Sequence, residues 1–363
     1  MKKLIISLFS ILILFTYSSC DDEEENTVAT EIVVPENFTV DIPSSISTDA
    51  NGGLTGRTEG DGDGIIEGNE IYQAVPFFIF IGEESARIIE LIFPIAAALE
   101  QQNVQTLIYT SDDDGRDKEV TINRNVTRGG KEYAYELTTF DVLDNAQALQ
   151  MLWNTEPIEG IAIISPYQID HTDDSEPDAL LRIDYSEDDP DYEATMTVYI
   201  SGIDPEVDGL DNLKLWAGRN GNVVDVVGNS NHPGFVLFDA NFTGGRNYAF
   251  VGRGDETTDI GVINLALPPS NVTTNNILTE YSVYNVLFGE IDAVAGGFFT
   301  PEEIDDILAE ANSPAYFNDV QGFITSGLDN QPAGFSNEFI DLSNLTPFVP
   351  NDIRTLEVQF IIN

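Results

Sequence analysis

Residues 213–227 read Leu-Lys-Leu-Trp-Ala-Gly-Arg-Asn-Gly-Asn-Val-Val-Asp-Val-Val, which places an Asn-Gly pair between two apolar segments. Leu213–Ala217 and Val223–Val227 have the composition of strands, and Gly218-Arg219-Asn220-Gly221 joins them. Asn-Gly favours a tight hairpin because both residues tolerate the positive φ angles that the turn requires. This stretch therefore predicts two antiparallel strands, and the same pattern extends to both sides of it.

Further strand-like segments, separated by turn residues, follow one another along the chain. They are Val75–Ile81, Thr106–Thr110, Glu119–Asn125, Glu132–Leu137, Gly160–Ser165, Leu180–Tyr185, Thr195–Ser201, Phe235–Phe238, Tyr248–Val251, Ile260–Leu267 and Thr355–Ile362. Gly129-Gly130 marks one more hairpin turn, since glycine adopts positive φ without strain. No fixed repeat is present, which argues against a solenoid or a propeller.

Three segments predict helices. Glu83–Gln102 carries apolar residues at helical spacing and contains Pro94, which should kink or divide the helix. Asp141–Trp153 fits a second helix. A third starts at Thr300-Pro301-Glu302-Glu303, which offers an N-cap hydroxyl, proline at the first helical position and a glutamate that can complete a capping box. The prediction is a β-rich α+β fold, with antiparallel sheets built from hairpins and about three helices.

The composition predicts four regions along the chain. They are a signal peptide at residues 1–19, a disordered tether rich in acidic residues, Ser, Thr and Gly at 20–60, an N-terminal α+β domain at 61–186 and a C-terminal β-rich domain at 193–363. The break between the two domains falls at Ser186-Glu187-Asp188-Asp189-Pro190-Asp191, because a stretch this acidic resists packing.

The N-terminus has the layout of an export signal. Met1-Lys2-Lys3 is basic, Leu4–Phe15 is apolar, and Tyr17-Ser18-Ser19 precedes Cys20, the single cysteine of the chain. This order resembles a bacterial lipoprotein signal, although Tyr17 stands where an aliphatic residue is usual. The resemblance implies cleavage before Cys20, lipidation of its thiol and attachment to a membrane through that lipid. A plain signal peptide is the alternative.

An acidic run, Asp21-Asp22-Glu23-Glu24-Glu25, follows Cys20 directly. Dense like charge does not fold, so the run predicts a solvated tether. It also resembles the surface-export signal of Bacteroidota lipoproteins, a resemblance that implies a location and no particular activity. That location is the outer membrane, where a lipid-anchored protein faces the medium. A simple spacer remains the alternative.

The charge and the residue counts exclude several kinds of function. The formal net charge is −48, which repels nucleic acid and attracts cations. High acidity also keeps a secreted protein soluble without any ligand. With two histidines and one cysteine, a histidine-based zinc site, a cysteine-rich cluster and a disulfide framework are not expected.

Residues 59–70 resemble the twelve-residue calcium loop of the EF-hand family. The matching positions are Glu59, Asp61 and Asp63 with side-chain oxygens, Gly64 at the sharp turn, Ile65 through its carbonyl, and Glu67 and Glu70 at the ninth and twelfth places. Two departures are the glutamate at the first position and flanks that do not resemble helices. The resemblance implies a solitary Ca²⁺ loop, and the alternative is an acidic, glycine-rich turn.

Other polar and aromatic residues favour structural roles. Asp112-Asp113-Asp114 is typical of an exposed hairpin tip, and the segment Asp170-His171-Thr172-Asp173-Asp174 is typical of a solvated loop. The alternative is that His171, among these carboxylates, serves as a proton donor or a metal ligand. Trp153 and Trp216 could stack against sugars, but their apolar neighbours favour core packing. No nucleophile elbow, phosphate-binding loop or dinucleotide motif is present, and no catalytic residue is assigned.

The interpretation that these features favour is a surface-anchored lipoprotein with a non-enzymatic binding or structural role, stabilised by Ca²⁺ around Asp61. Its partner would be a glycan or another surface protein, and not nucleic acid. One alternative is a carbohydrate-binding accessory protein of a polysaccharide-uptake system. Another is a hydrolase that uses paired carboxylates, with His171 as a partner.

Overall fold

The computed structural model describes residues 38–48, 69–90, 105–172, 176–204, 210–234, 245–309 and 311–362, together with Ile92, Ala96, Leu99, Leu237 and Phe242. The strands are β1 Thr106–Thr110, β2 Asp117–Arg128, β3 Lys131–Asp141, β4 Ala146–Thr155, β5 Ile158–Ile164, β6 Leu180–Ser186, β7 Ala194–Ser201, β8 Asn212–Asn220, β9 Val223–His232, β10 Arg246–Asp255, β11 Ile260–Ala266, β12 Ala315–Asn318 and β13 Gly322–Ser326. The helices are α2 Asn69–Tyr72, α3 Ala74–Glu90, α5 Pro166–Ile169, α7 Ile277–Glu280, α8 Val283–Ala295, α9 Pro301–Ile307, α10 Asn337–Ile340 and α11 Pro350–Arg354, with a 3₁₀ turn at Leu328–Asn330.

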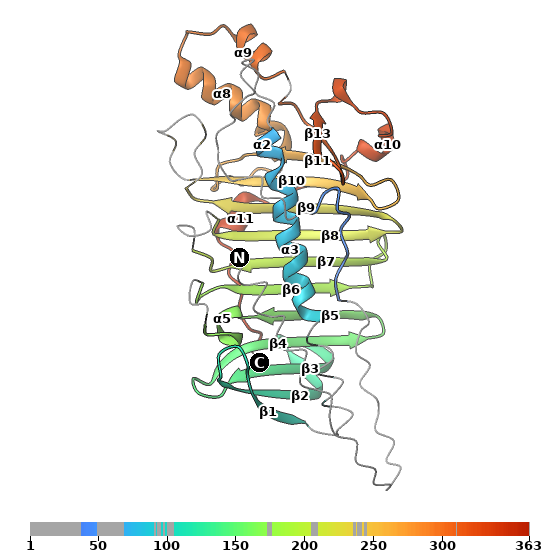
Figure 1. Ribbon diagram of the computed structural model, residues 1–363, viewed down its shortest axis with the longest axis vertical. Helices are drawn as coiled ribbons and strands as arrows, with labels where there is room; N and C mark the ends of the chain where they lie inside the picture. The colour runs from blue at the N-terminus through green and yellow to red at the C-terminus, as the bar shows by residue number, and fades with distance from the viewer. Residues whose placement is uncertain are drawn as a thin grey trace.

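The thirteen strands pair in chain order into one antiparallel sheet (Figure 1). The residue pairing follows from the tight turns, as in β8 and β9, where Asn220 lies opposite Val223 across the two-residue turn Gly221-Asn222. The β-rich α+β prediction is therefore confirmed. The stretch at which a domain break was expected is the turn between β6 and β7, and these two strands pair with each other.

One face of the sheet is covered by α3, which crosses the strands in Figure 1, and by the N-terminal segment Phe38–Thr48. A Cβ on Gly82 of α3 would lie 2.4 Å from Leu215 of β8, so glycine permits the close approach. Glu83 links α3 to the N-terminal segment, because its carboxylate accepts hydrogen bonds from the Ile42 N–H at 3.2 Å and from the Ser47 hydroxyl at 2.5 Å. We call this side of the sheet the α3 face.

The opposite face is crossed by the C-terminal segment, so we call it the α11 face. Asn212 on β8 donates to the Ile353 carbonyl at 2.9 Å, and Asn229 on β9 donates to the Phe348 carbonyl at 2.8 Å. Further along, the Ile361 N–H donates to Gln150 Oε1 at 2.7 Å. The sheet is thus sandwiched between an N-terminal helix and a C-terminal extended segment.

Three of the predicted elements differ from the structure. The apolar run 75–81 lies in α3 and not in a strand, because such a run suits either element when both its sides are buried, as at Val75 and Phe78. The predicted helix 141–153 is mostly β4, whose pairing with β3 and β5 overrides its helical composition. Thr355–Ile362 forms no strand, because side chains on the sheet face, such as those of Ser201 and Gln150, bind its backbone.

The third predicted helix is confirmed at its start. In α9, the Thr300 hydroxyl accepts from the Glu303 N–H at 3.3 Å, and the Glu303 carboxylate accepts from the Thr300 N–H at 2.7 Å. The predicted strand at 235–238 and the second half of the predicted helix at 83–102 lie mostly outside the described residues. Within the described ranges, no helix is both long enough and apolar enough to cross a membrane.

Candidate functional site

The residues predicted for the lipid anchor and the calcium loop lie mainly outside the described part of the chain. Those outside are Cys20, Glu59, Asp61, Asp63, Ile65 and Glu67. Glu70 falls in the first turn of α2. The lipid and calcium predictions therefore stay predictions.

An open pocket on the α11 face is built around a cross-strand ion pair. Asp225 of β9 lies directly opposite Arg253 of β10. Arg253 donates from Nε to Asp225 Oδ1 at 2.6 Å and from Nη2 to Oδ2 at 3.1 Å, which is a two-pronged geometry. The side chain of Asp225 is 7% exposed and that of Arg253 is 16% exposed. The pair is thus nearly buried in the floor of the pocket.

Two aromatic residues stand beside this ion pair. The Tyr192 hydroxyl donates to Asp225 Oδ2 at 2.9 Å, and the Tyr192 ring meets Trp216 edge-on at a centroid distance of 5.1 Å. Burial, together with the negative charge of Asp225, raises the pKa of Tyr192, so its phenol stays protonated and keeps donating. A Cβ on Gly218 would lie 2.5 Å from the Trp216 ring, so glycine makes room for the indole.

The cavity has a volume of about 990 Å³, within the range of small-ligand sites. We call it the Trp216 cleft. Besides the four residues just described, it is lined by two more acids, Asp191 and Glu338, and by Asn220, Val223, Ser336, Phe339, Asn344 and Leu345. A half-buried aromatic ring, a fixed carboxylate and guanidinium, and two amides can together bind a ligand that has both an apolar face and hydroxyl groups.

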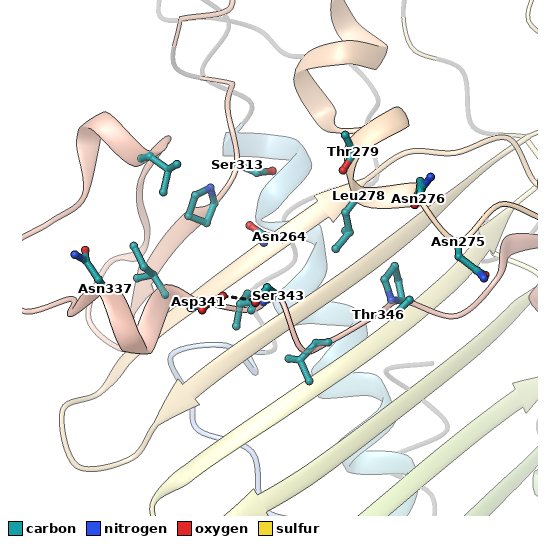
Figure 2. Close-up of a pocket in the computed structure, with 16 residues that line it drawn as sticks. Asn264, Asn275, Asn276, Leu278, Thr279, Ser313, Asn337, Asp341, Ser343 and Thr346 are labelled. Carbon is teal, nitrogen blue, oxygen red and sulfur yellow. Dashed lines mark hydrogen bonds between the residues drawn. The ribbon is translucent and has the colours of Figure 1, made fainter.

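A second cavity, of about 720 Å³, lies on the other side of α10 (Figure 2). Arg253 pairs with Val262 of β11, and Asn264 follows two residues later on the same face of the sheet. Since Asn264 lines this second cavity, we call it the Asn264 pocket. The two cavities share Leu345 and are separated by Ser336–Leu345, which we call the α10 wall.

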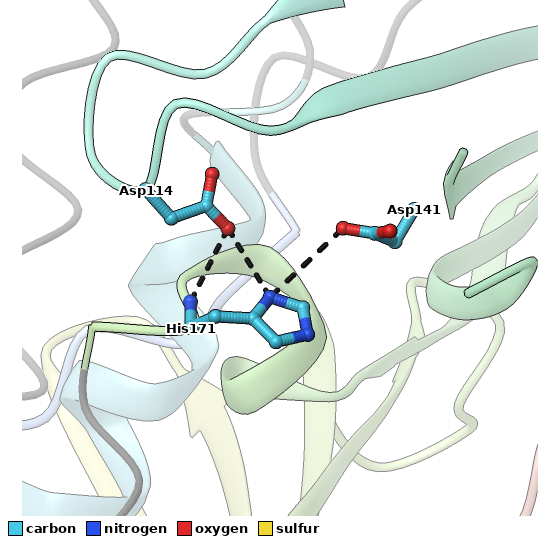
Figure 3. A group of neighbouring side chains, drawn as sticks. All are labelled: Asp114, Asp141 and His171. Carbon is cyan, nitrogen blue, oxygen red and sulfur yellow. Dashed lines mark hydrogen bonds and ion pairs between the residues drawn. The ribbon is translucent and has the colours of Figure 1, made fainter. Parts of the chain in front are cut away.

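A separate charged cluster lies near the β1 end of the sheet, and three of its side chains are drawn in Figure 3. It joins Asp114 in the β1–β2 turn, Asp141 at the end of β3 and His171 after α5. His171 Nδ1 lies 3.1 Å from Asp114 Oδ2 and 3.9 Å from Asp141 Oδ2. The backbone N–H of His171 also donates to Asp114 Oδ2, at 3.2 Å. These three residues offer a histidine nitrogen and two carboxylate oxygens within 4.8 Å of one another, which is a possible metal-ligand set.

A lysine ammonium lies between the same carboxylates. Lys118 Nζ donates to Asp114 Oδ2 at 2.9 Å, to Asp141 Oδ2 at 2.8 Å and to the Gln168 carbonyl at 2.9 Å. An ammonium has three protons, so all three have acceptors. The Lys118 side chain is 2% exposed, and this residue already supplies the positive charge that a metal would bring. We call this group the Asp141 network.

Hydrogen bonding in the Asp141 network favours ionised carboxylates. Burial alone would raise the pKa of Asp141, but hydrogen bonds from Lys118, the Asp144 N–H and Arg116 outweigh it, so its pKa lies well below its usual range. The pKa of Asp114 is also lowered, because hydrogen bonds from Lys118 and from the N–H groups of Arg116 and His171 exceed the effect of burial. The network is therefore a set of fixed ion pairs.

The sequence-based predictions for these polar residues are partly wrong. Asp114 and His171 were expected in a solvated turn and loop, but their side chains are 2% and 10% exposed. The two tryptophans differ from each other. Trp153 is fully buried, as expected, whereas Trp216 lines a cavity and is only half-buried.

The importance of Tyr192, Asp225 and Arg253 was not recognised from the sequence. A usable signal was present, since Asp225 is an acid within the apolar strand Val223–Val227. Comparison of the chain with protein-family models, curated proteins and solved structures finds no match.

Proposed function

We propose that the protein is a lipid-anchored protein of the cell surface that binds carbohydrate in the Trp216 cleft. The proposed location rests on the export signal that ends in Cys20 and on the acidic run that follows it. The observation that carries the ligand class is the half-buried Trp216 beside a nearly buried, hydrogen-bonded carboxylate in an open cavity.

The chemistry of a sugar explains this choice. A pyranose has an apolar C–H surface that packs on an aromatic ring and a rim of hydroxyl groups that both donate and accept hydrogen bonds. Trp216 supplies apolar aromatic area. Asp225 and Arg253 supply an acceptor and a donor that are already oriented, which lowers the ordering cost of binding.

Binding without turnover is the role proposed for this cleft. Both oxygens of Asp225 accept hydrogen bonds from Arg253 or Tyr192, so the carboxylate is held in place as a fixed acceptor. Glycoside hydrolysis uses two carboxyl groups with different tasks on either side of the scissile bond. Asp191 and Glu338 also line the cleft, so the role proposed for Asp225 rests on its being held by Arg253 and Tyr192 and not on a lack of further carboxyl groups.

A glycan array tests the proposal directly. The full chain, purified in detergent, should retain a defined set of neutral glycans. Trp216→Ala should lower their affinity at least about tenfold, as expected for an aromatic hot spot. Phe298→Ala is the matched control, because Phe298 is 89% exposed on the loop between α8 and α9.

A second variant, Asn344→Ala, keeps the test valid if Trp216→Ala unfolds. Asn344 is exposed and lines the same cleft, so its loss should weaken binding without affecting the core. Absence of any bound glycan, or equal affinity in the wild type and both cleft variants, would overturn the proposal.

A further inference from the structure

The lining of the Asn264 pocket differs in charge from that of the Trp216 cleft. Its polar residues are amides and hydroxyls, with Asp341 as the one acid and no lysine, arginine or histidine among the residues that line it. The Asp341 carboxylate accepts a hydrogen bond from the Ser343 N–H at 3.0 Å, as drawn in Figure 2. A pocket with this lining suits a neutral, polar ligand.

One atom of the pocket lacks a partner. The side-chain oxygen of Asn264 is buried and accepts no hydrogen bond from the described residues. A buried acceptor left unsatisfied costs about 1–3 kcal/mol, so a turn of the Asn264 amide that brings this oxygen to a donating hydroxyl of a ligand breaks no existing hydrogen bond of the oxygen. Figure 2 places Asn264 among Ser313, Leu278 and Ser343, within the cavity.

The α10 wall, which separates the two cavities, lines both of them. Along Ser336–Leu345, residues such as Phe339 and Asn344 line the Trp216 cleft, whereas Ile340 and Ser343 line the Asn264 pocket. Arg253, which fixes Asp225 in the cleft, also donates from Nη1 to the carbonyls of Glu338, Phe339 and Asp341, each at 3.4 Å. One guanidinium thus holds both the floor of the cleft and the wall.

We infer that the Asn264 pocket is a second carbohydrate subsite, which binds a neutral sugar residue of the same chain whose other residues occupy the Trp216 cleft. The ligand is therefore a neutral oligosaccharide that passes over the α10 wall. This inference rests on the proposed carbohydrate function. It adds that affinity depends on chain length and on the hydroxyl groups that face Asn264.

The test uses the neutral glycans retained on the array, compared as a series of increasing length by titration calorimetry. Wild-type affinity should rise at least tenfold once the oligosaccharide is long enough to reach both cavities. Asn264→Leu, which keeps the volume and removes the amide, should abolish that gain and change the affinity for the shortest bound member less than twofold. Thr346→Val, elsewhere in the pocket lining, should act in the same direction.

Asn123→Leu is the matched control, since Asn123 is an exposed residue of β2 and lines neither cavity. If glycans bind with Trp216 dependence but their affinity ignores length and Asn264, this inference fails while the proposed function stands. Retention of acidic glycans alone would also overturn it. If no glycan binds, both fall together.

Discussion

The Asp141 network and the Trp216 cleft are built from the same kind of pair, a buried carboxylate opposite a cation on the neighbouring strand. Lys118 lies opposite Asp141 across β2 and β3, and Arg253 lies opposite Asp225 across β10 and β9. The two sites differ in what surrounds the pair. Loops and α5 close over the first, whereas the second opens onto a cavity beside an aromatic ring.

This difference separates a charge pair that stabilises the fold from one that is available to a ligand. In the Asp141 network, every proton of the Lys118 ammonium is used by the protein itself. In the Trp216 cleft, the ion pair leaves room beside it for hydroxyl groups, and Trp216 offers apolar area. Burial of charge alone therefore does not identify a binding site in this sheet.

Replacing the two cations tests the comparison most strongly. Lys118→Met should lower the free energy of unfolding by about 3–5 kcal/mol, because it leaves two buried carboxylates without their shared cation. Arg253→Met should cost less, about 1–3 kcal/mol, because solvent reaches the carboxylate that it exposes. Urea unfolding of the full chain measures both.

Lys131→Met is the control for the loss of a positive charge. The Lys131 side chain is 51% exposed and pairs with Glu159 at 2.9 Å, so its loss should cost less than about 1 kcal/mol. If Lys118→Met were as mild as this control, the Asp141 network would not be the closed ion cluster described above.

Local sequence signals predicted the parts of the fold that depend on nearby residues. The hairpin predicted at Asn220-Gly221 is present, with Gly221-Asn222 as its turn, and the Thr300–Glu303 capping box is present as well. Both involve groups within three residues of each other. By contrast, the run 75–81 is apolar throughout, so its helical state depends on burial between the sheet and the N-terminal segment. No periodicity within the run carries that information.

The sites were harder to predict because their members are far apart in the chain. Asp114 and His171 are 57 residues apart, and Tyr192 and Asp225 are 33 residues apart. Their contacts depend on the pairing of several hairpins in sequence order, which is a property of the whole sheet. An acid such as Asp225 inside a valine-rich strand is the signal that sequence analysis alone can recognise.

The loss of folding stability at low pH is expected to depend on the Asp141 network. The pKa values of Asp114 and Asp141 are lowered in the folded protein, whereas aspartate in the unfolded chain titrates near about 3.9. Between the folded and unfolded values, the unfolded state binds more protons, so the stabilisation is present above about pH 4 and is lost as the pH falls further. Asp141→Asn should therefore flatten the fall in stability between about pH 5 and pH 3.

Asp188→Asn, at an exposed position in the β6–β7 turn, corrects for the change in net charge. Unfolding free energies at several pH values measure the slope for each protein. A slope for Asp141→Asn as steep as that of the wild type would show that other acids, and not the Asp141 network, control acid unfolding.

The smallest effect is expected from Tyr192→Phe, which removes one hydroxyl and keeps the ring against Trp216. Loss of the 2.9 Å hydrogen bond to Asp225 should lower the free energy of unfolding by about 0.5–1.5 kcal/mol at neutral pH. Carbohydrate affinity should fall less than in Trp216→Ala, since the substituted side chain still presents an aromatic edge. An equal loss of affinity would assign recognition to the hydroxyl and not to the rings.

The pH dependence of the same variant tests whether the phenol is held as a donor. Because the pKa of Tyr192 is raised in the folded protein, the unfolded state alone loses the phenolic proton above about pH 10. Deprotonation then favours the unfolded wild type, whereas Tyr192→Phe has no proton to lose at this position. The stability gap between the two proteins should therefore shrink as the pH rises, and a constant gap up to about pH 11 would contradict a partly buried phenol that donates to Asp225.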